Sequence, residues 1–412
     1  MKKNLRFNLI LLYLNDNNHL FTSLNKKENM VNTLFKNLLI ISAGVLVMSA
    51  CKKPVNSGTE KDVPEMPSTA PNYSKSTNDE LAYLGRVLFY DKKLSSNNAI
   101  ACASCHKQAN GFADNGAMSE GVNGQLTSRN APPVFPKNGR LFWDGRAGSL
   151  SDMVIMPITN TVEMNSTSFD ALCTELAATS YYPKLFNAAF NSESITKEKI
   201  RAALTEFVSN FEFTDNRLKS SAIPFGKALT SDEKSGKDLF FGKAKCSECH
   251  HVDQSGSSGM GNGYGITDES HNIGLDYQST DGGCGEFSKN TAQHGEFMMP
   301  VLLNIELTAP YMHDGRFATL EEVIEHYNSK VVLSSTLDWR LKDFSDFKDL
   351  NTAKANLDKN KNNKIEESEA PNRQAQRLNL SDSEKASLVK FLKTLTDKNL
   401  LSDNKFDNPF IH

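Results

Sequence analysis

The run Cys102-Ala103-Ser104-Cys105-His106 decides the fold of this chain, and it recurs as Cys246-Ser247-Glu248-Cys249-His250. Two cysteines one helical turn apart, followed directly by a histidine, are typical of c-type haem attachment. The thiols add to the haem vinyl groups and the imidazole binds the iron. A zinc site or a redox-active dithiol requires neither the adjacent histidine nor the duplication. We therefore expect two covalently bound haem c groups, with His106 and His250 as iron ligands.

Length and charge narrow the class of protein. At 412 residues the chain is long enough for two domains that each bury a core. The formal net charge is −3 and the sequence pI is about 6.3. Nucleic acid is therefore not expected as a partner, because the chain has no basic field to replace the counterions of a phosphate backbone.

The first 50 residues form a predicted signal region. From Met30 a short cationic start leads into an apolar run over 38–47, and small residues then precede Cys51. This pattern resembles a bacterial lipoprotein signal, in which cleavage before Cys51 leaves that residue carrying lipid; an ordinary secretory signal is the alternative. The apolar run is too short for a permanent membrane span. We expect a periplasmic protein that contacts the membrane only through a lipid anchor.

Beyond the signal, the chain has a tether and two similar halves. Residues 51–77 are rich in Pro, Ser, Thr, Asn and Lys and lack an apolar period, as in a flexible tether. Four segments then form two matched pairs: Gly85–Phe89 with Gly236–Phe240, and Trp143–Leu150 with His313–Leu320. The repetition predicts two haem domains in tandem, over 78–220 and 221–412.

The periodicity of apolar residues predicts a mostly α fold. Helix-like patterns cover 168–190, 196–215 and 231–240, and the segments between them are rich in Gly, Asn and Pro. We expect two tandem cytochrome c-like haem domains in which the haems occupy much of the core.

Five further motifs lie in a fixed order around the haem sites. They are Arg129-Asn130-Ala131-Pro132, Phe142-Trp143-Asp144-Gly145-Arg146, Val162-Glu163-Met164, Leu307-Thr308-Ala309-Pro310-Tyr311-Met312-His313-Asp314-Gly315 and Thr319-Leu320-Glu321-Glu322-Val323. Between about 78 and 397 the chain thus resembles the bacterial di-haem cytochrome c peroxidases and the related MauG-type enzymes. The resemblance implies reduction of hydrogen peroxide to water, with electrons from a small periplasmic donor, a cytochrome c or a copper protein.

The resemblance also implies a division of roles. His106 would bind the iron that reacts with peroxide in the first domain, and His250 the electron-transfer iron in the second. Glu163 matches the distal carboxylate, which would move a proton between the two peroxide oxygens; a surface position is the alternative for an isolated Glu. Trp143 matches the aromatic residue between the haems, which relays electrons.

Two ligand sets follow from the same resemblance. Asn130, Thr308 and Pro310 match a calcium site between the haems that uses side-chain and backbone oxygens. Tyr327 lies fourteen residues after the His of the His-Asp-Gly motif, where the peroxidases have a Met ligand and the MauG-type enzymes a Tyr. We expect Tyr327 to bind the second haem iron, with the adjacent His326 as the rival ligand.

The first haem iron is expected to be open in the oxidised protein. In many relatives a His between the first haem motif and the Arg-Asn-Ala-Pro segment caps this iron. Here the corresponding position is Val122, and no His occurs between Lys107 and Arg140. Met118 is the alternative cap, although a thioether binds ferric iron weakly.

An insertion near the C-terminus resembles an EF-hand loop over 358–369. Its expected calcium ligands are Asp358, Asn360, Asn362, Lys364 (through its backbone), Glu366 and Glu369. Asn363 replaces the usual sixth-position Gly and tolerates the left-handed backbone required there. A loop rich in Lys and Asn can mimic this pattern without binding an ion.

Several alternatives remain. Cys173 and Cys284 match no motif and could form a disulfide or stay as two thiols. The peroxidase is the leading hypothesis for function. The others are a MauG-like oxidase that modifies a protein substrate, and a di-haem electron carrier in which Glu163 has no role.

Overall fold

The structure is a computed structural model, and it describes residues 63–64, 70–73, 76, 78–135, 139–211, 218, 228–250, 269–343 and 374–410. They belong to a compact unit, Val63–His412. The signal region, most of the tether and the EF-hand-like loop 358–369 lie outside the described residues. Among the described helices, none combines the length and the apolar character that a membrane span requires.

The predicted mostly α fold is confirmed. The α-helices are α2 (Asp79–Tyr90), α3 (Cys102–Cys105), α4 (Leu150–Met153), α5 (Met156–Thr159), α6 (Phe169–Ala177), α7 (Tyr182–Phe190), α8 (Lys197–Ser209), α10 (Ser231–Phe241), α11 (Gly283–Ser288), α12 (Leu320–Glu325), α14 (Asp382–Lys393) and α15 (Lys398–Ser402). Short 3-10 turns are η1 (Lys92–Leu94), η2 (Gln108–Asn110), η3 (Val122–Gly124), η4 (Cys246–Glu248), η5 (Thr291–Gln293), η6 (Ile305–Leu307) and η8 (Trp339–Leu341), and η7 (His326–Lys330) is a π-helical turn. Strands β1 (Ser270–His271) and β2 (Phe297–Met298) pair antiparallel.

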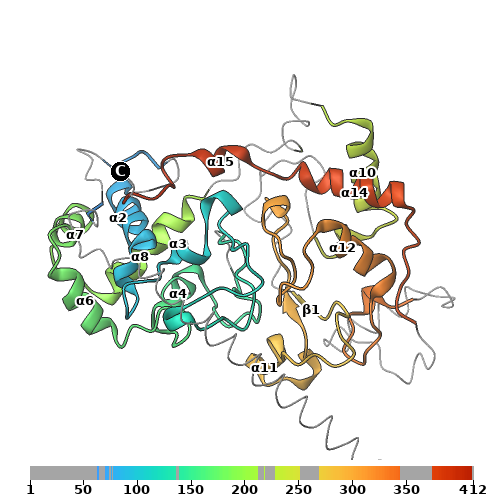
Figure 1. The fold of residues 1–412 in the computed structure, drawn as a ribbon, viewed down its shortest axis with the longest axis horizontal. Coiled ribbons are helices and arrows are strands. Elements are labelled where there is room, and N and C mark those ends of the chain that lie inside the picture. Colours follow the sequence, from blue (N-terminus) through green and yellow to red (C-terminus); the bar gives the residue numbers. More distant parts are fainter. Residues whose placement is uncertain are drawn as a thin grey trace, which may run out of the picture. The chain divides into compact units, whose positions relative to one another are not determined.

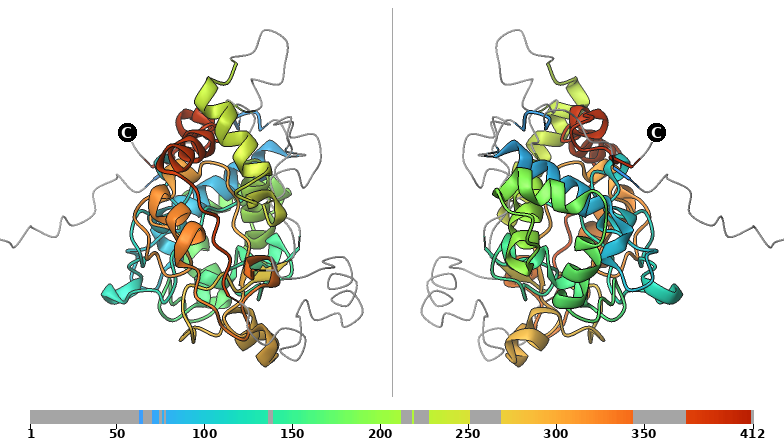
Figure 2. Two further views of the ribbon diagram at one scale, coloured as in Figure 1. Left: turned by 90° about the vertical axis from the view of Figure 1, so that its right-hand side faces the viewer. Right: turned by 90° about the vertical axis from the view of Figure 1, so that its left-hand side faces the viewer.

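Each half is built on one close helix crossing. Helix α2 packs against α8, and α10 packs against α14 (Figures 1 and 2). A Cβ added to Gly85 would lie 2.0 Å from the carbonyl oxygen of Ala203, and one added to Gly236 would lie 2.0 Å from that of Ser387. The repeated Gly therefore lets two helix backbones touch at the same place in both halves.

The second repeated segment forms the same turn twice. Residues 141–147 and 311–317 are each closed by an antiparallel bridge between their first and last residues. Gly145 has φ +68° and Gly315 has φ +64°, a left-handed conformation that favours glycine. The sequence repeat thus corresponds to a structural repeat.

The C-terminal tail packs against elements of the first half. The chain runs from α14 through α15 toward α2 (Figure 1). Tyr90 Oη donates to the carbonyl of Phe406 at 2.6 Å, and Arg86 Nε donates to that of Asp407 at 2.8 Å. The Phe406 ring is buried against Phe207 and Phe211. The predicted ranges 78–220 and 221–412 stay a prediction, and the structure adds that the tail of the second range completes the first core.

Candidate active site

The first haem motif lies on the wall of a cavity of about 610 Å³, a volume typical of a ligand or cofactor site. Cys102, at the start of α3, and His106 both line it. His106 Nδ1 donates to the carbonyl oxygen of Phe112 at 2.9 Å. With the proton on Nδ1 this bond orients the ring, and Nε2 would then supply the lone pair that iron ligation requires. The residues present therefore fit a covalently attached haem.

The second haem motif lines a separate cavity of about 190 Å³ together with Tyr327. This cavity is smaller than the first, but Cys246, Cys249 and His250 all reach it. Burial raises the pKa of each of the two thiols to about 12, so both sulfurs are neutral in this wall. A neutral thioether in the same place suits these surroundings, and the lining fits a second haem.

Glu163 lies in the first cavity, together with His106. The turn after α5 presents it, because Asn160 Oδ1 accepts hydrogen bonds from the backbone N–H groups of Val162 at 2.9 Å and Glu163 at 3.1 Å. Burial raises the pKa of Glu163, and the charge of Arg146 offsets part of that rise. The structure thus brings together the two residues that the peroxidase hypothesis needs at one site.

The loop that carries Val122, at the position of the capping His in relatives, supports this turn from outside the cavity. Val122 is fully buried, and its N–H donates to the carbonyls of Val162 and Glu163, each at 3.0 Å. Neither Val122 nor Met118 is among the described residues that line the first cavity, where His106 is the one histidine. Met153, from α4, does line it. The open first iron stays a prediction that this geometry supports.

Trp143 lies between the two cavities and lines both. Its indole Nε1 donates to the carbonyl of Asn130 at 2.9 Å, and its own carbonyl accepts from Met298 N in β2 at 2.8 Å. The residues that line both cavities are Asn130, Pro132, Pro133, Trp143, Met298, Met299, Pro300 and Val301. Trp143 thus belongs to a wall that both cavities share, and its role as a relay stays a prediction.

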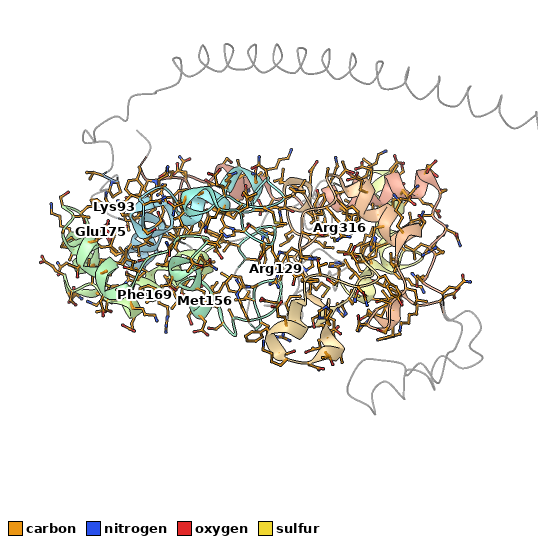
Figure 3. All side chains as sticks on the ribbon, turned by 60° about the horizontal axis from the view of Figure 1, so that its bottom comes forward. Lys93, Arg129, Met156, Phe169, Glu175 and Arg316 are labelled. Atoms are coloured by element: carbon orange, nitrogen blue, oxygen red, sulfur yellow. The ribbon has the colours of Figure 1, made fainter. Side chains whose placement is uncertain are left out.

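Arg129 forms ion pairs with one acid from each half of the chain, Asp144 and Asp281. Its guanidinium binds Asp281 through two bonds of 2.7 Å and Asp144 through one of 2.6 Å. In Figure 3 it lies next to α11, which begins two residues after Asp281. Burial alone would raise the pKa of the Asp281 carboxyl, but the bond to Arg129 holds it below its usual value. The sequence offered no signal for this ion pair, because its partners lie far apart in irregular segments.

The structure separates the two candidate ligands in η7. Tyr327 lines the second cavity, and burial followed by the nearby thiols of Cys249 and Cys246 raises its pKa. His326 does not line that cavity, and its Nε2 lies 2.9 Å from the carbonyl oxygen of Ile273. π-Helical turns are frequent at functional sites. Of the two, only Tyr327 lines the second cavity, and its role as an iron ligand stays a prediction.

The predicted inter-haem calcium residues converge on one wall. Asn130, Thr308 and Pro310 all line the second cavity. The Asn130 amide nitrogen donates to the carbonyl of Gly116 at 3.0 Å, which leaves the amide oxygen as the atom that could bind a cation. This arrangement fits an oxygen-ligand site, and calcium at it stays a prediction.

The two cysteines outside the haem motifs that the structure describes, Cys173 and Cys284, are not joined. Cys173 is partly buried and Cys284 is fully buried, and both are free thiols. The Cys284 sulfur lies 3.9 Å from the carbonyl oxygen of Trp143. The structure therefore has two separate thiols and not a disulfide between Cys173 and Cys284.

Comparison with known proteins gives a consistent set of relatives. Residues 79–234 match the family model described as di-haem cytochrome c peroxidase. Methylamine utilization protein MauG of Methylorubrum extorquens is 35% identical over 271 residues, 64% of this chain and 73% of that protein. Cytochrome c551 peroxidase of Nitrosomonas europaea is 32% identical over 297 residues, 71% of this chain and 83% of that protein.

The solved structures agree. The crystal structure of a MauG-like protein associated with microbial copper homeostasis superposes with a TM-score of 0.64 at 29% identity, and the match covers 86% of this chain and all of the other. The diheme peroxidase BthA from Burkholderia thailandensis has the same fold, with a TM-score of 0.59 at 21% identity over 82% of this chain and 93% of that one.

Proposed function

The chain belongs to the di-haem cytochrome c peroxidase family, and we propose that it reduces hydrogen peroxide to water with electrons from a small periplasmic redox protein, a cytochrome c or a copper protein. The observation that carries this proposal is the shared cavity of His106 and Glu163, walled by Trp143. The net reaction consumes one peroxide, two electrons and two protons and yields two waters. An acid–base residue and an electron route must therefore meet at one site.

The residues of the chain divide this work. When bound, the haem irons supply the peroxide-binding position and the redox capacity. The hydrogen bond from His106 to the carbonyl of Phe112 orients the imidazole. Glu163 can take a proton from one peroxide oxygen and deliver it to the other, so that water leaves. The raised pKa brings this carboxyl closer to the pH at which it must both accept and donate a proton.

Electrons would enter through the second domain. We propose that His250 and Tyr327, which both line the second cavity, would bind its iron. Trp143, in the wall between the cavities, would relay electrons from the second haem to the first. On this proposal 78–220 is the peroxidatic domain and 221–412 the electron-transfer domain. A phenol oxygen as sixth ligand stabilises oxidised iron more than a thioether does, so the second haem would have a low potential.

Tyr327 also favours a second candidate, a MauG-like oxidase that modifies a protein substrate. The resemblance that assigns Tyr327 a ligand role follows the MauG-type enzymes, and the relatives include proteins named MauG as well as peroxidases. Both candidates use the same cavities. They differ in the source of the electrons, which is a donor protein in one case and the modified substrate in the other.

We further propose a periplasmic location with a lipid anchor at Cys51, and calcium at two places. One is the Asn130, Thr308 and Pro310 set, and the other is the loop 358–369, for which Asp358 to Glu369 supply the expected ligands. The first would hold the wall between the haems, and the second would have a structural role.

The test is steady-state peroxide consumption by the holoprotein with reduced cytochrome c, and separately with a reduced copper protein. Glu163→Gln should abolish most of the turnover with either donor. Glu175→Gln is the matched control, because Glu175 is an exposed residue on α6 (Figure 3) and should leave turnover unchanged. No turnover with either donor, combined with peroxide-dependent oxidation of a protein substrate, would favour the MauG-like candidate. If the protein shows neither activity, the di-haem electron carrier is the remaining hypothesis.

A further inference from the structure

A buried charged cluster on the wall of the second cavity has no role in the function proposed above. It consists of His271 in β1, Asp338 and Arg340 around η8, and Glu269 just before β1. The first three line the cavity. Burial, followed by the charge of Asp338, raises the pKa of the Cys249 thiol. The cluster therefore lies close to a point at which the second haem would be attached.

The geometry fixes the tautomer of His271. Its Nδ1 lies 2.7 Å from Asp338 Oδ2, and a carboxylate in that position accepts the proton on Nδ1. In the neutral ring Nε2 then carries only a lone pair. This atom is buried and has no hydrogen-bond partner among the described residues. The ring thus presents one empty protonation site inside the cavity wall.

The surroundings of that site favour a positive charge. Glu269 Oε2 lies 3.5 Å from His271 Nε2, too far for a hydrogen bond but close enough for an ion pair once the ring is protonated. Arg340 binds both carboxylates, Asp338 at 3.2 Å and Glu269 at 3.3 Å. Burial would raise the pKa of Asp338, but the bonds to His271 and Arg340 hold it below its usual value. A second cation at His271 would balance the two acids.

A solvent-exposed carboxylate lies beside the buried ring. The His271 side chain is 5% exposed, whereas that of Glu269 is 42% exposed. A rotation of Glu269 that closes the 3.5 Å gap to hydrogen-bond distance would let it carry a proton from solvent to Nε2.

We propose that His271 takes up one proton when the second haem accepts an electron. For each electron that the second haem would accept from the donor, the imidazole would gain one proton from water by way of Glu269, so the charge of the site would not change. The physical reason is that an electron added at the cavity attracts a proton more strongly in a buried wall than in water. When the electron moves on to the first haem, the proton is released.

Two other charged groups, Lys245 and Glu248, line the same cavity, and Glu296 lies beside β1. Lys245 Nζ donates to Gln376 Oε1 at 2.9 Å, and Glu248 lines the cavity from η4. On the β2 side, Glu296 accepts a hydrogen bond from Ser270 Oγ at 2.9 Å. His313 is a second buried histidine on this cavity, and its ring stacks on Phe297 of β2. Among the described histidines that line the cavity, His271 is the one beside Asp338 and Glu269.

The test is the reduction potential of the second haem, measured on the holoprotein by spectroscopic titration from about pH 5 to pH 9. In the unaltered protein the potential should fall as pH rises, because a proton is bound with the electron; the limit is 59 mV per pH unit for one proton per electron. His271→Gln should retain a donor to Asp338 and reduce this slope at least twofold. His294→Gln is the matched control, because His294 is exposed and does not line the cavity.

An unchanged slope in His271→Gln, with a native low-spin spectrum, would overturn the proposal. Glu269→Gln tests the same idea without disturbing the buried pair. Loss of that carboxylate should move the pH-dependent region to lower pH, and no movement would count against the proposal. The inference takes one element from the proposed function, the presence of a haem in the second cavity. The titration contains no peroxide, so its failure is distinguishable from an absence of peroxidase activity.

Discussion

Gly236→Ala should destabilise the protein, although Ala is the better helix former. In a helix interior this change alone stabilises by roughly 0.5–1 kcal/mol. Here the new Cβ would lie 2.0 Å from the carbonyl oxygen of Ser387 and 2.8 Å from the Cβ of Phe391. A carbon and a carbonyl oxygen normally stay about 3.3 Å apart, so α10 and α14 would have to separate by more than about 1 Å.

The size of the effect follows from these contacts. Overpacking costs about 1–3 kcal/mol, and the upper end applies because the clashing atoms belong to a helix backbone and cannot rotate away. Subtracting the gain in helix propensity leaves a loss of about 2 kcal/mol. For a domain of this size each kcal/mol corresponds to about 2–4 °C, so the melting temperature should fall by about 4–8 °C. Gly85→Ala should behave alike, because its Cβ meets the carbonyl of Ala203 at the same distance.

The assay is thermal denaturation of the holoprotein, followed by far-ultraviolet circular dichroism and by haem absorbance. Gly148→Ala is the control, because a Cβ there would have no neighbour within 4 Å, and its stability should change by less than about 0.5 kcal/mol. A Gly236→Ala protein that melts at or above the temperature of the unaltered protein would show that α10 and α14 do not touch through this residue.

Glu163→Gln should lower turnover with peroxide about 10²- to 10⁴-fold. Because burial raises the pKa of Glu163 above 4.5, activity should fall as pH drops through that raised pKa, and a pH–rate profile of the variant should lack this acid limb. Tyr327→Phe should change the absorption spectrum of the low-spin haem and raise its potential; an unchanged spectrum would exclude Tyr327 as the ligand. With Val122 at the capping position, electron paramagnetic resonance of the oxidised protein should show a high-spin haem that reacts with peroxide without prior reduction, and an inert, wholly low-spin protein would contradict this. Calorimetry should detect a calcium-binding event that the double change Asp358→Ala and Glu369→Ala removes; a variant that loses no calcium-binding event would contradict a site in this loop.

The parts of the site that are close in sequence were predictable because covalent chemistry sets their spacing. Two thiols and an imidazole must meet one haem, so Cys102, Cys105 and His106 have to be neighbours along the chain. The repeated Gly85 and Gly236 likewise record a local demand, a close approach of two helix backbones. The mostly α fold followed from apolar periodicity. Pro183 in the first turn of α7 explains why the predicted helical stretch 168–190 is two helices.

The sequence by itself therefore determined the two haem-attachment motifs, the helical class, the duplication and the family motifs. Only the tertiary structure decided which residues meet across long separations. Arg129 binds Asp281, His271 pairs with Asp338, and Phe406 completes the core of the first half. Arg129, Asp281 and Phe406 lie in irregular segments and His271 in a strand of two residues, so no helical or strand period signals which way these side chains face. Their contacts depend on how the packed helices bring distant loops together, and the energy that selects them comes from burial of the whole core.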